Sequence, residues 1–185
     1  NKIIYKTENS YLSEKIKGHE FVVERMFGDT DLVNAGMAVF KKSALNSLDN
    51  EYKKMKGAGD WLFWVQIALQ GDVFISGKSL NYCFRHDNTL TSSSIVTGRD
   101  MIEGNQVFSY VLTQANPTKE QIKRALKQRV FIYDTQSRAY LNKEIKENSK
   151  KNLLALHPDL KKEFRKFYFK KYLSKLKNIS LSFLK

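Results

Sequence analysis

The clearest hydrophobic pattern in the chain lies between Trp61 and Leu69. The spacing i, i+3, i+4, i+7, i+8 puts these apolar side chains on one face of a helix. The positions are Trp61, Trp64, Val65, Ala68 and Leu69. Gly71 suits the end of such a helix, because glycine readily adopts the conformation that often follows a last turn. We therefore predict a helix that begins near Asp60 and ends before Gly71.

Shorter apolar runs on either side of this helix predict strands. Residues 32–40 combine apolar and small side chains and are typical of a short buried strand, and residues 72–76 predict a second strand. The segment 13–27 has a helical tendency, and the Ser/Thr-rich segment 87–98 is typical of a polar loop. Strands and helices alternate here, so we expect residues 1–97 to form a compact α/β part.

The pattern changes after residue 97 and becomes helical. Residues 101–114 predict one helix, which Asn116-Pro117 ends. Thr118 with Gln121 three residues later has the form of a capping box, so a long helix is predicted over 118–151. One or two further helices follow. We expect residues 98–185 to be a helical C-terminal extension.

Composition places the chain among folded proteins without disulfides. With 42% hydrophobic and 12% aromatic residues it can build a core, and no apolar run approaches the ~18 residues that span a bilayer. Cys83 is the single cysteine, so it cannot form an internal disulfide, and three histidines are too few for a Cys/His metal cluster. A cytoplasmic location is the simplest interpretation.

The net charge of +13 is concentrated near the C-terminus, where residues 161–185 hold nine Lys or Arg against a single acid, Glu163. Such a density indicates an anionic partner. Aromatic residues and leucines recur there near helical spacing, at Phe164, Phe167, Tyr168, Tyr172, Leu173 and Leu176.

Three interpretations of this basic segment remain open. The first is a helix that packs on the domain and exposes a solvated basic face. The second is an amphipathic helix on an anionic membrane, at the inner face of the cell membrane. Its contacts would be Lys166, Lys170, Lys171 and Lys175. Nucleic acid ranks third, because no nucleic-acid-binding signature accompanies the charge.

Asp60 is the most conspicuous single acid, because it stands between Gly59 and Trp61 at the start of the predicted helix. A carboxylate is common there for stability alone, since it binds free N–H groups and meets the positive end of the helix dipole. The alternative is a catalytic base. Glycines allow a ligand to approach the backbone closely, and Trp61 and Trp64 are side chains on which sugar rings stack.

Three ordered segments carry a resemblance to a known family. They read DLVNAGMAVFKKSAL, GDWLFWVQIALQGDVFISGKSLNY and RHDNTLTSS, and together they span about a third of the chain. This set resembles the C-terminal half of a family 2 glycosyltransferase of the GT-A fold. The resemblance implies an α/β nucleotide-diphospho-sugar transferase fold, of which the chain would hold the C-terminal part, followed by the helical extension.

The resemblance also implies roles for individual residues. Asp60 matches the acid that deprotonates the acceptor hydroxyl, and Trp61 and Trp64 would shape the acceptor pocket. Arg85 and His86 match residues near the donor diphosphate, and His86 is also a candidate metal ligand. The chain departs from the family pattern in two places: Gly59 precedes the acid where glutamate is common, and Phe84 occupies the usual arginine position.

The activity implied is transfer of a sugar, with inversion, from a nucleotide-sugar donor to a glycan or lipid-linked hydroxyl acceptor. Synthesis of bacterial cell-surface polysaccharide is the implied setting. A divalent metal, Mg²⁺ or Mn²⁺, would be held mainly by an Asp-x-Asp motif upstream. Asp29-Thr30-Asp31 has that form but does not follow an apolar strand, so we do not assign the metal to it.

We therefore expect this chain to be a segment of a longer enzyme whose other half binds the nucleotide. Alone, it would hold no cofactor and would not turn over. The alternative from another functional class is a non-enzymatic basic helical module that binds nucleic acid or an anionic membrane.

Overall fold

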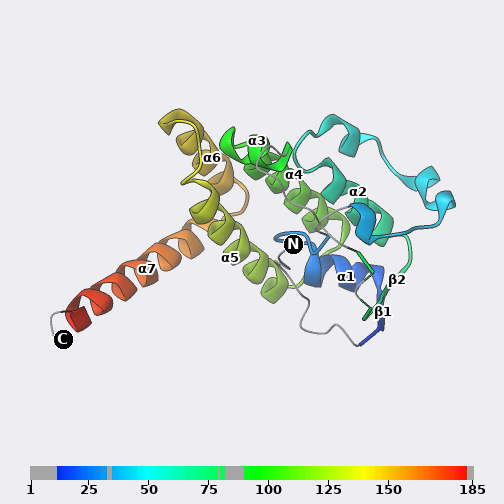
Figure 1. The fold of residues 1–185 in the computed structure, drawn as a ribbon, viewed down its shortest axis with the longest axis horizontal. Coiled ribbons are helices and arrows are strands. Elements are labelled where there is room, and N and C mark those ends of the chain that lie inside the picture. Colours follow the sequence, from blue (N-terminus) through cyan, green and yellow to red (C-terminus); the bar gives the residue numbers. More distant parts are fainter. Residues whose placement is uncertain (1–11, 33–34, 79, 82–89, 183–185) are drawn as a thin grey trace.

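The computed structural model describes residues 12–32, 35–78, 80–81 and 90–182. Figure 1 shows that this part of the chain is mostly helical. Its short 3₁₀ helices are η1 (Ala35–Met37), η2 (Lys42–Ser47) and η3 (Glu51–Lys54). The other elements in chain order are β1 (Glu14–Lys17), α1 (Gly18–Arg25), α2 (Gly59–Ala68), β2 (Asp72–Ile75), α3 (Leu90–Val96), α4 (Arg99–Gln114), α5 (Lys119–Gln136), α6 (Lys143–Ala155) and α7 (Leu160–Ser182).

The expected GT-A α/β fold is wrong for this structure. That fold needs a central, largely parallel sheet, whereas the sheet of the described residues has two antiparallel strands, with Glu14 opposite Ile75 and Lys17 opposite Asp72. Four-residue strands cannot cover a large apolar face. The helices therefore bury their apolar side chains mainly against one another.

The predicted strand over 32–40 is also wrong. Residues 33–34 lie outside the described part; Ala35–Met37 forms η1, while Val39 and Phe40 are exposed. An apolar run becomes a buried strand only when another strand hydrogen-bonds to it. The partner of β2 is instead β1, which lies within the segment 13–27 that we expected to be helical.

Two helix predictions need correction in the C-terminal half. Within the predicted polar loop 87–98, residues 87–89 are outside the described part, but Leu90–Val96 is helical. The predicted long helix over 118–151 is two helices, α5 and α6, separated by a turn. Asn142 starts α6 by accepting the backbone N–H of Ile145 at 2.9 Å, and such a side-chain cap favours a helix start over helix continuation.

Other local predictions are confirmed. The helix predicted between Asp60 and Gly71 is α2, and the strand predicted over 72–76 is β2. The capping box at the start of α5 is present: the Gln121 N–H donates to the Thr118 hydroxyl at 3.3 Å, and the Thr118 N–H donates to Oε1 of Gln121 at 2.8 Å. The helix and the capping box depend on side chains a few residues apart, which explains why the pattern predicts them. The alternation predicts β2, but its partner β1 comes from a distant part of the chain.

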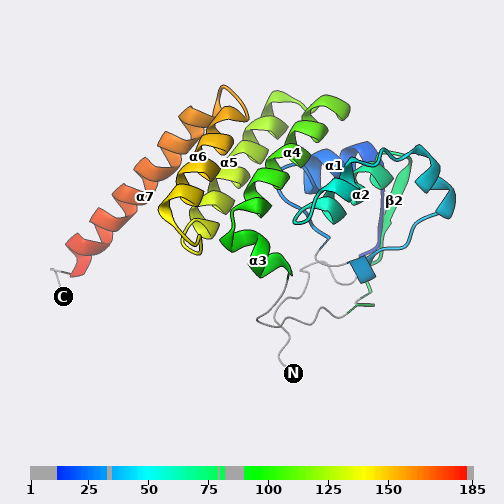
Figure 2. The same ribbon diagram turned by 90° about the horizontal axis from the view of Figure 1, so that it is seen from above.

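One hydrophobic core joins the two halves of the chain. Phe27 of the N-terminal part stacks on Phe108 of α4 with ring centroids 4.4 Å apart, and α2 packs on both α1 and α4. Figure 2 shows α4, α5, α6 and α7 following one another across the molecule, with α1, α2 and β2 beyond α4. The C-terminal end of α7 extends away from this body. The boundary expected at residue 97 falls at the turn between α3 and α4, and the hydrophobic core includes residues from both sides of it.

Candidate functional site

Asp60 lies in the first turn of α2, and its side chain is exposed. The helix begins at Gly59, with Ala58 in the capping position and no side-chain cap on it. The Asp60 carboxylate accepts the backbone N–H of Trp61 at 2.8 Å. Asp60 therefore supports the helix start, as the simpler interpretation requires, and also presents a negative oxygen to solvent, as a base requires.

Glu103 of α4 holds the loop that leads into α2. Its carboxylate accepts three successive backbone N–H groups, from Lys56 at 3.1 Å, Gly57 at 2.6 Å and Ala58 at 2.8 Å. Gly57 packs so closely on α3 that a Cβ there would fall on the Ser94 hydroxyl. The loop before Asp60 is consequently fixed from both sides.

Trp61 and Trp64 are buried, with only 6% and 8% of their surface exposed. The Trp61 indole N–H donates to the Met26 carbonyl at 3.0 Å, and Trp64 makes edge contacts with Phe40 and Phe63. Neither ring presents a free face, so the structure gives them no surface for stacking a sugar. The two tryptophans instead anchor α2, and with it Asp60, to the core.

A buried arginine lies behind Trp61. Arg129 of α5 donates to the Asn105 side-chain oxygen at 3.1 Å and to the Met101 carbonyl at 3.0 Å, and its guanidinium lies 5.8 Å from the Trp61 ring centre. Gly104 makes room for it, because a Cβ there would meet the Arg129 nitrogens at 2.9 and 3.0 Å. Burial lowers the pKa of Arg129 to about 10, so it stays charged at neutral pH.

Glu103 and Arg129 were missed by reasoning from the sequence. Arg129 is a buried charged residue next to the buried Val130, and the half-buried Glu103 precedes the buried Gly104 and Asn105. A charge in a core-facing stripe is a signal that could have identified Arg129, because charged groups are seldom buried without partners. No comparable signal marks Glu103.

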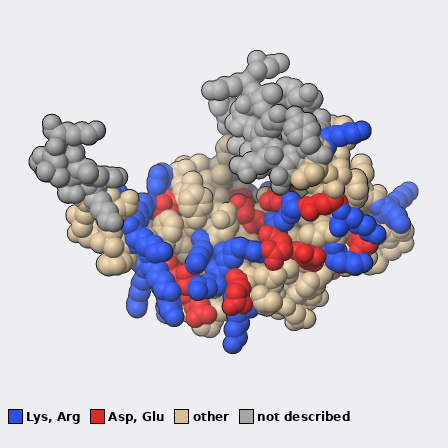
Figure 3. Space-filling view, turned by 90° about the horizontal axis from the view of Figure 1, so that it is seen from below, with Lys and Arg blue, Asp and Glu red and all other residues tan. Residues whose placement is uncertain are grey.

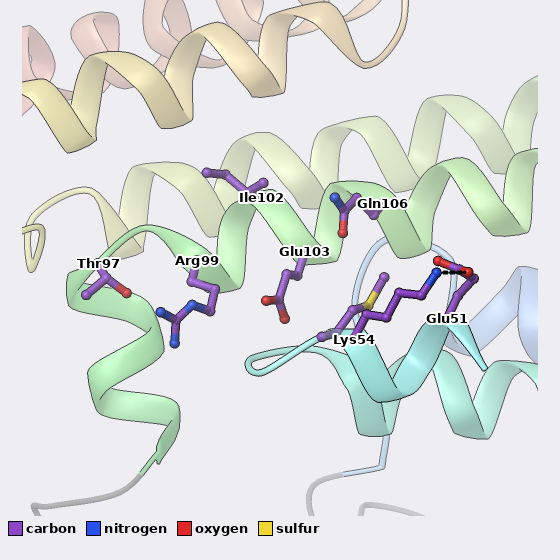
Figure 4. Close-up of a pocket in the computed structure, with 8 residues that line it drawn as sticks. Glu51, Lys54, Thr97, Arg99, Ile102, Glu103 and Gln106 are labelled. Carbon is purple, nitrogen blue, oxygen red and sulfur yellow. Dashed lines mark hydrogen bonds and ion pairs between the residues drawn. The ribbon is translucent and has the colours of Figure 1, made fainter.

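A cavity of about 510 Å³ opens beside this loop, between η3 and the first half of α4. Figure 4 shows its side chains, with the Lys54–Glu51 ion pair on one wall and Arg99 and Glu103 on the other. The lining residues are Glu51, Lys54, Met55, Thr97, Arg99, Ile102, Glu103 and Gln106. Both charge signs and an amide are represented, so the cavity offers both hydrogen-bond donors and acceptors.

Asp60 does not line the cavity, but two residues of the cavity wall contact the segment that immediately precedes it. Met55 and Glu103, both in the cavity wall, contact the stretch that runs into α2: a Cβ on Gly59 would lie 3.4 Å from Met55 Cβ, and Glu103 binds Gly57. Met55 and Glu103 therefore belong both to the cavity wall and to the surroundings of the segment that leads into α2.

The proposed donor-diphosphate residues, Arg85 and His86, lie outside the described residues. Their roles, including His86 as a metal ligand, stay predictions. Among the described residues, no group of three or more His, Cys, Asp or Glu side chains could hold a metal ion.

The four lysines predicted to contact a membrane differ in their surroundings. Lys171 is half-buried and bound to both carboxylate oxygens of Asp134 at 2.6 Å, so it faces the body of the protein. Lys166 is exposed but pairs with Glu163 at 3.3 Å. Lys170 and Lys175 are exposed. None of the helices in the part of the chain that the structure describes is both long and apolar enough to cross a membrane.

Comparisons with known proteins identify no family. No protein-family model, curated protein or solved structure matches this chain.

Proposed function

We propose that this chain forms the acceptor-binding part of a glycosyltransferase, with Asp60 as the general base. The acceptor hydroxyl oxygen would bond to the anomeric carbon of the donor sugar as the bond from that carbon to the nucleoside diphosphate breaks. The hydroxyl proton would pass to the Asp60 carboxylate, and the nucleoside diphosphate would leave with the bonding electrons. Attack from the side opposite the leaving group inverts the anomeric carbon.

The observation that carries the proposal is the position of Asp60. Its carboxylate is exposed, while the neighbouring Trp61 is locked in the core and Glu103 fixes the loop before it. A general base is effective when it is held rigidly where the substrate proton arrives. The proposal also rests on the order of the three sequence segments that resemble glycosyltransferases, in which Asp60 falls at the base position.

The acceptor is proposed to bind in the cavity between η3 and α4. Its polar wall would hydrogen-bond the hydroxyl groups of a glycan or the head of a lipid-linked sugar, and its adjacency to the first turn of α2 would bring one hydroxyl toward Asp60. Arg99 and Gln106 supply N–H donors, and Glu103 supplies an acceptor.

The donor side of the reaction rests on residues outside the described part. Arg85 and His86 are proposed to contact the diphosphate of the nucleotide sugar. A divalent metal would neutralise charge on the leaving diphosphate, but the described residues hold no cluster for it, so no step here depends on one. The proposed setting is the cytoplasmic side of the cell membrane, in synthesis of cell-surface polysaccharide.

The substitution Asp60→Asn in the native gene product tests the proposal. We expect transfer from UDP-glucose, UDP-galactose or UDP-N-acetylglucosamine to a cell-derived glycan and lipid extract to fall about a hundredfold or more, because the base is lost. Donor binding should be unchanged. The free energy of unfolding should change by less than about 1 kcal/mol, because the asparagine oxygen can still accept the Trp61 N–H.

Asp159→Asn is the matched control, since Asp159 is an exposed acid distant in sequence from α2, and it should leave transfer unchanged. Full activity of Asp60→Asn would show that Asp60 only supports the start of α2. Absence of transfer from all three donors by the unsubstituted protein would count against the proposed activity itself.

A further inference from the structure

The helix α7 has two faces with different partners. Its inner face packs on the body: Leu160 and Glu163 are buried, and the Phe164 ring lies 5.8 Å from the Tyr133 ring of α5. Lys171 extends this attachment through its ion pair with Asp134. These inner-face residues therefore have their contacts within the protein.

The outer face of α7 carries an exposed apolar stripe at its C-terminal half. The exposed fractions are 64% for Phe169, 59% for Tyr172, 41% for Leu173 and 44% for Leu176. These positions follow the spacing i, i+3, i+4, i+7, so the four side chains form one continuous strip about 10 Å long. Leaving four large apolar side chains in water along one strip is unfavourable.

Basic side chains continue the same face toward the start of α7. Lys162 and Arg165 lie seven and four residues before Phe169, which are helical repeats of its position, and both are exposed. Lys170 and Lys175 flank the stripe and are exposed as well. Figure 3 shows Lys and Arg side chains gathered over the end of the molecule that α7 forms. The outer face is thus basic in its first half and apolar in its second half.

We propose that this outer face of α7 docks the protein on an anionic lipid bilayer. Phe169, Tyr172, Leu173 and Leu176 would enter the boundary between headgroups and acyl chains, while Lys162 and Arg165 would bind lipid phosphates at the surface. Lys171 takes no part, because its ion pair with Asp134 keeps it on the inner face. That ion pair holds the body of the protein on the side of α7 away from the lipid.

The distribution of charge distinguishes a bilayer from other occupants. A second copy in parallel contact would place Lys162 and Arg165 near the same positive groups of its partner, and one in antiparallel contact would place them on the partner's apolar stripe, so neither arrangement is favourable. Nucleic acid would satisfy the lysines but leave the apolar stripe in water. An anionic bilayer satisfies both halves of the face. The inference is independent of the proposed sugar transfer.

Vesicle co-sedimentation of the full chain tests the docking surface. The probes are vesicles of phosphatidylcholine and vesicles of phosphatidylcholine mixed equally with phosphatidylglycerol. We expect binding to the mixed vesicles alone, with weaker binding as salt rises. The double variant Phe169→Ser/Leu173→Ser should bind at least about tenfold more weakly, because less apolar surface enters the lipid. The double variant Lys162→Gln/Arg165→Gln should bind the mixed vesicles about tenfold more weakly, because two positive charges no longer meet lipid phosphates.

Matched controls remove the same residue types from surfaces outside α7, so they show whether the place of the residues matters. Phe74→Ser removes an exposed phenylalanine from β2, and Lys123→Gln/Lys127→Gln removes two exposed lysines from α5; neither should change binding by more than about twofold. Circular dichroism verifies that each variant remains folded. Equal binding to both kinds of vesicle, or unchanged binding by the Phe169→Ser/Leu173→Ser variant, would overturn the proposal. So would a dimer in analytical ultracentrifugation that this variant dissociates, because the stripe would then face a second copy.

Discussion

At the scale of single residues, the arrangement around Asp60 depends on two charged side chains from elsewhere in the chain. Glu103 binds three backbone N–H groups of the loop before α2, and Arg129 supports Trp61 from behind. Both come from helices in the C-terminal half. The position of a residue at the start of α2 is therefore set by groups more than forty positions away along the sequence.

Glu103→Ala tests this support. The substitution leaves the N–H groups of Lys56, Gly57 and Ala58 without their acceptor, and hydrogen bonds to a charged group are individually strong. We expect the free energy of unfolding, measured with urea, to fall by about 2–3 kcal/mol. Glu147→Ala is the control, because Glu147 makes only a surface pair with Lys143 at 3.6 Å. A loss no larger than that of the control would mean that the loop is held by other contacts.

At the scale of the elements, ionised Asp134 adds an ion pair to the packing of α7 on α5. Burial raises the pKa of Asp134, but hydrogen bonds from Lys171 and Tyr168 outweigh it, so this pKa lies below its ordinary value of 3.8. A carboxyl group with a lower pKa in the folded state contributes stability above the pKa of the unfolded chain. The contribution is lost as the pH falls through the lower, folded value.

Asp134→Asn should therefore destabilise the protein in a pH-dependent way. Near neutral pH we expect the variant to lose about 1 kcal/mol of unfolding free energy in urea titrations, because Lys171 and Arg138 lose their counter-charge. The difference from the unsubstituted protein should shrink as the pH falls below about 4, where the carboxylate itself becomes protonated. A difference that stays constant with pH would mean that Asp134 acts through its shape and not its charge.

At the scale of the whole molecule, the core crosses the boundary expected at residue 97. Trp61 and Val65 of α2 belong to the same cluster of buried residues as Met101 and Phe108 of α4. Two separate domains would each bury their own apolar side chains. In this structure, removing either half would expose the apolar face of the other.

Thermal unfolding tests this organisation. We expect a single cooperative transition for the full chain, with tryptophan fluorescence and far-UV circular dichroism changing at the same temperature. Fluorescence reports α2, whereas circular dichroism is dominated by the C-terminal helices. Separate transitions for the two signals would show that the parts unfold independently and would support the expected two-part division.

Some features of this protein depend on residues close together in the sequence, and others on contacts between distant segments. The helix α2 and the capping box at Thr118 follow from side chains a few residues apart, and the pattern predicts both of them. The pattern also predicts β2, but not its partner β1. The division of residues 118–151 at Asn142 was missed, because the cap competes with good helix formers on both sides. The apolar run 32–40 was misassigned because a strand depends on a partner elsewhere in the chain.

The sequence by itself determined the predominance of helix after residue 97, the basic and aromatic character of α7 and the place of Asp60 at a helix start. Each is set by composition or by short-range spacing. Only the tertiary structure decided that β1 pairs with β2, that Trp61 and Trp64 are buried and that Lys171 binds Asp134. These features depend on which segments meet in space. Periodicity shows which side chains share a face of a helix or strand, but packing selects the groups that they contact.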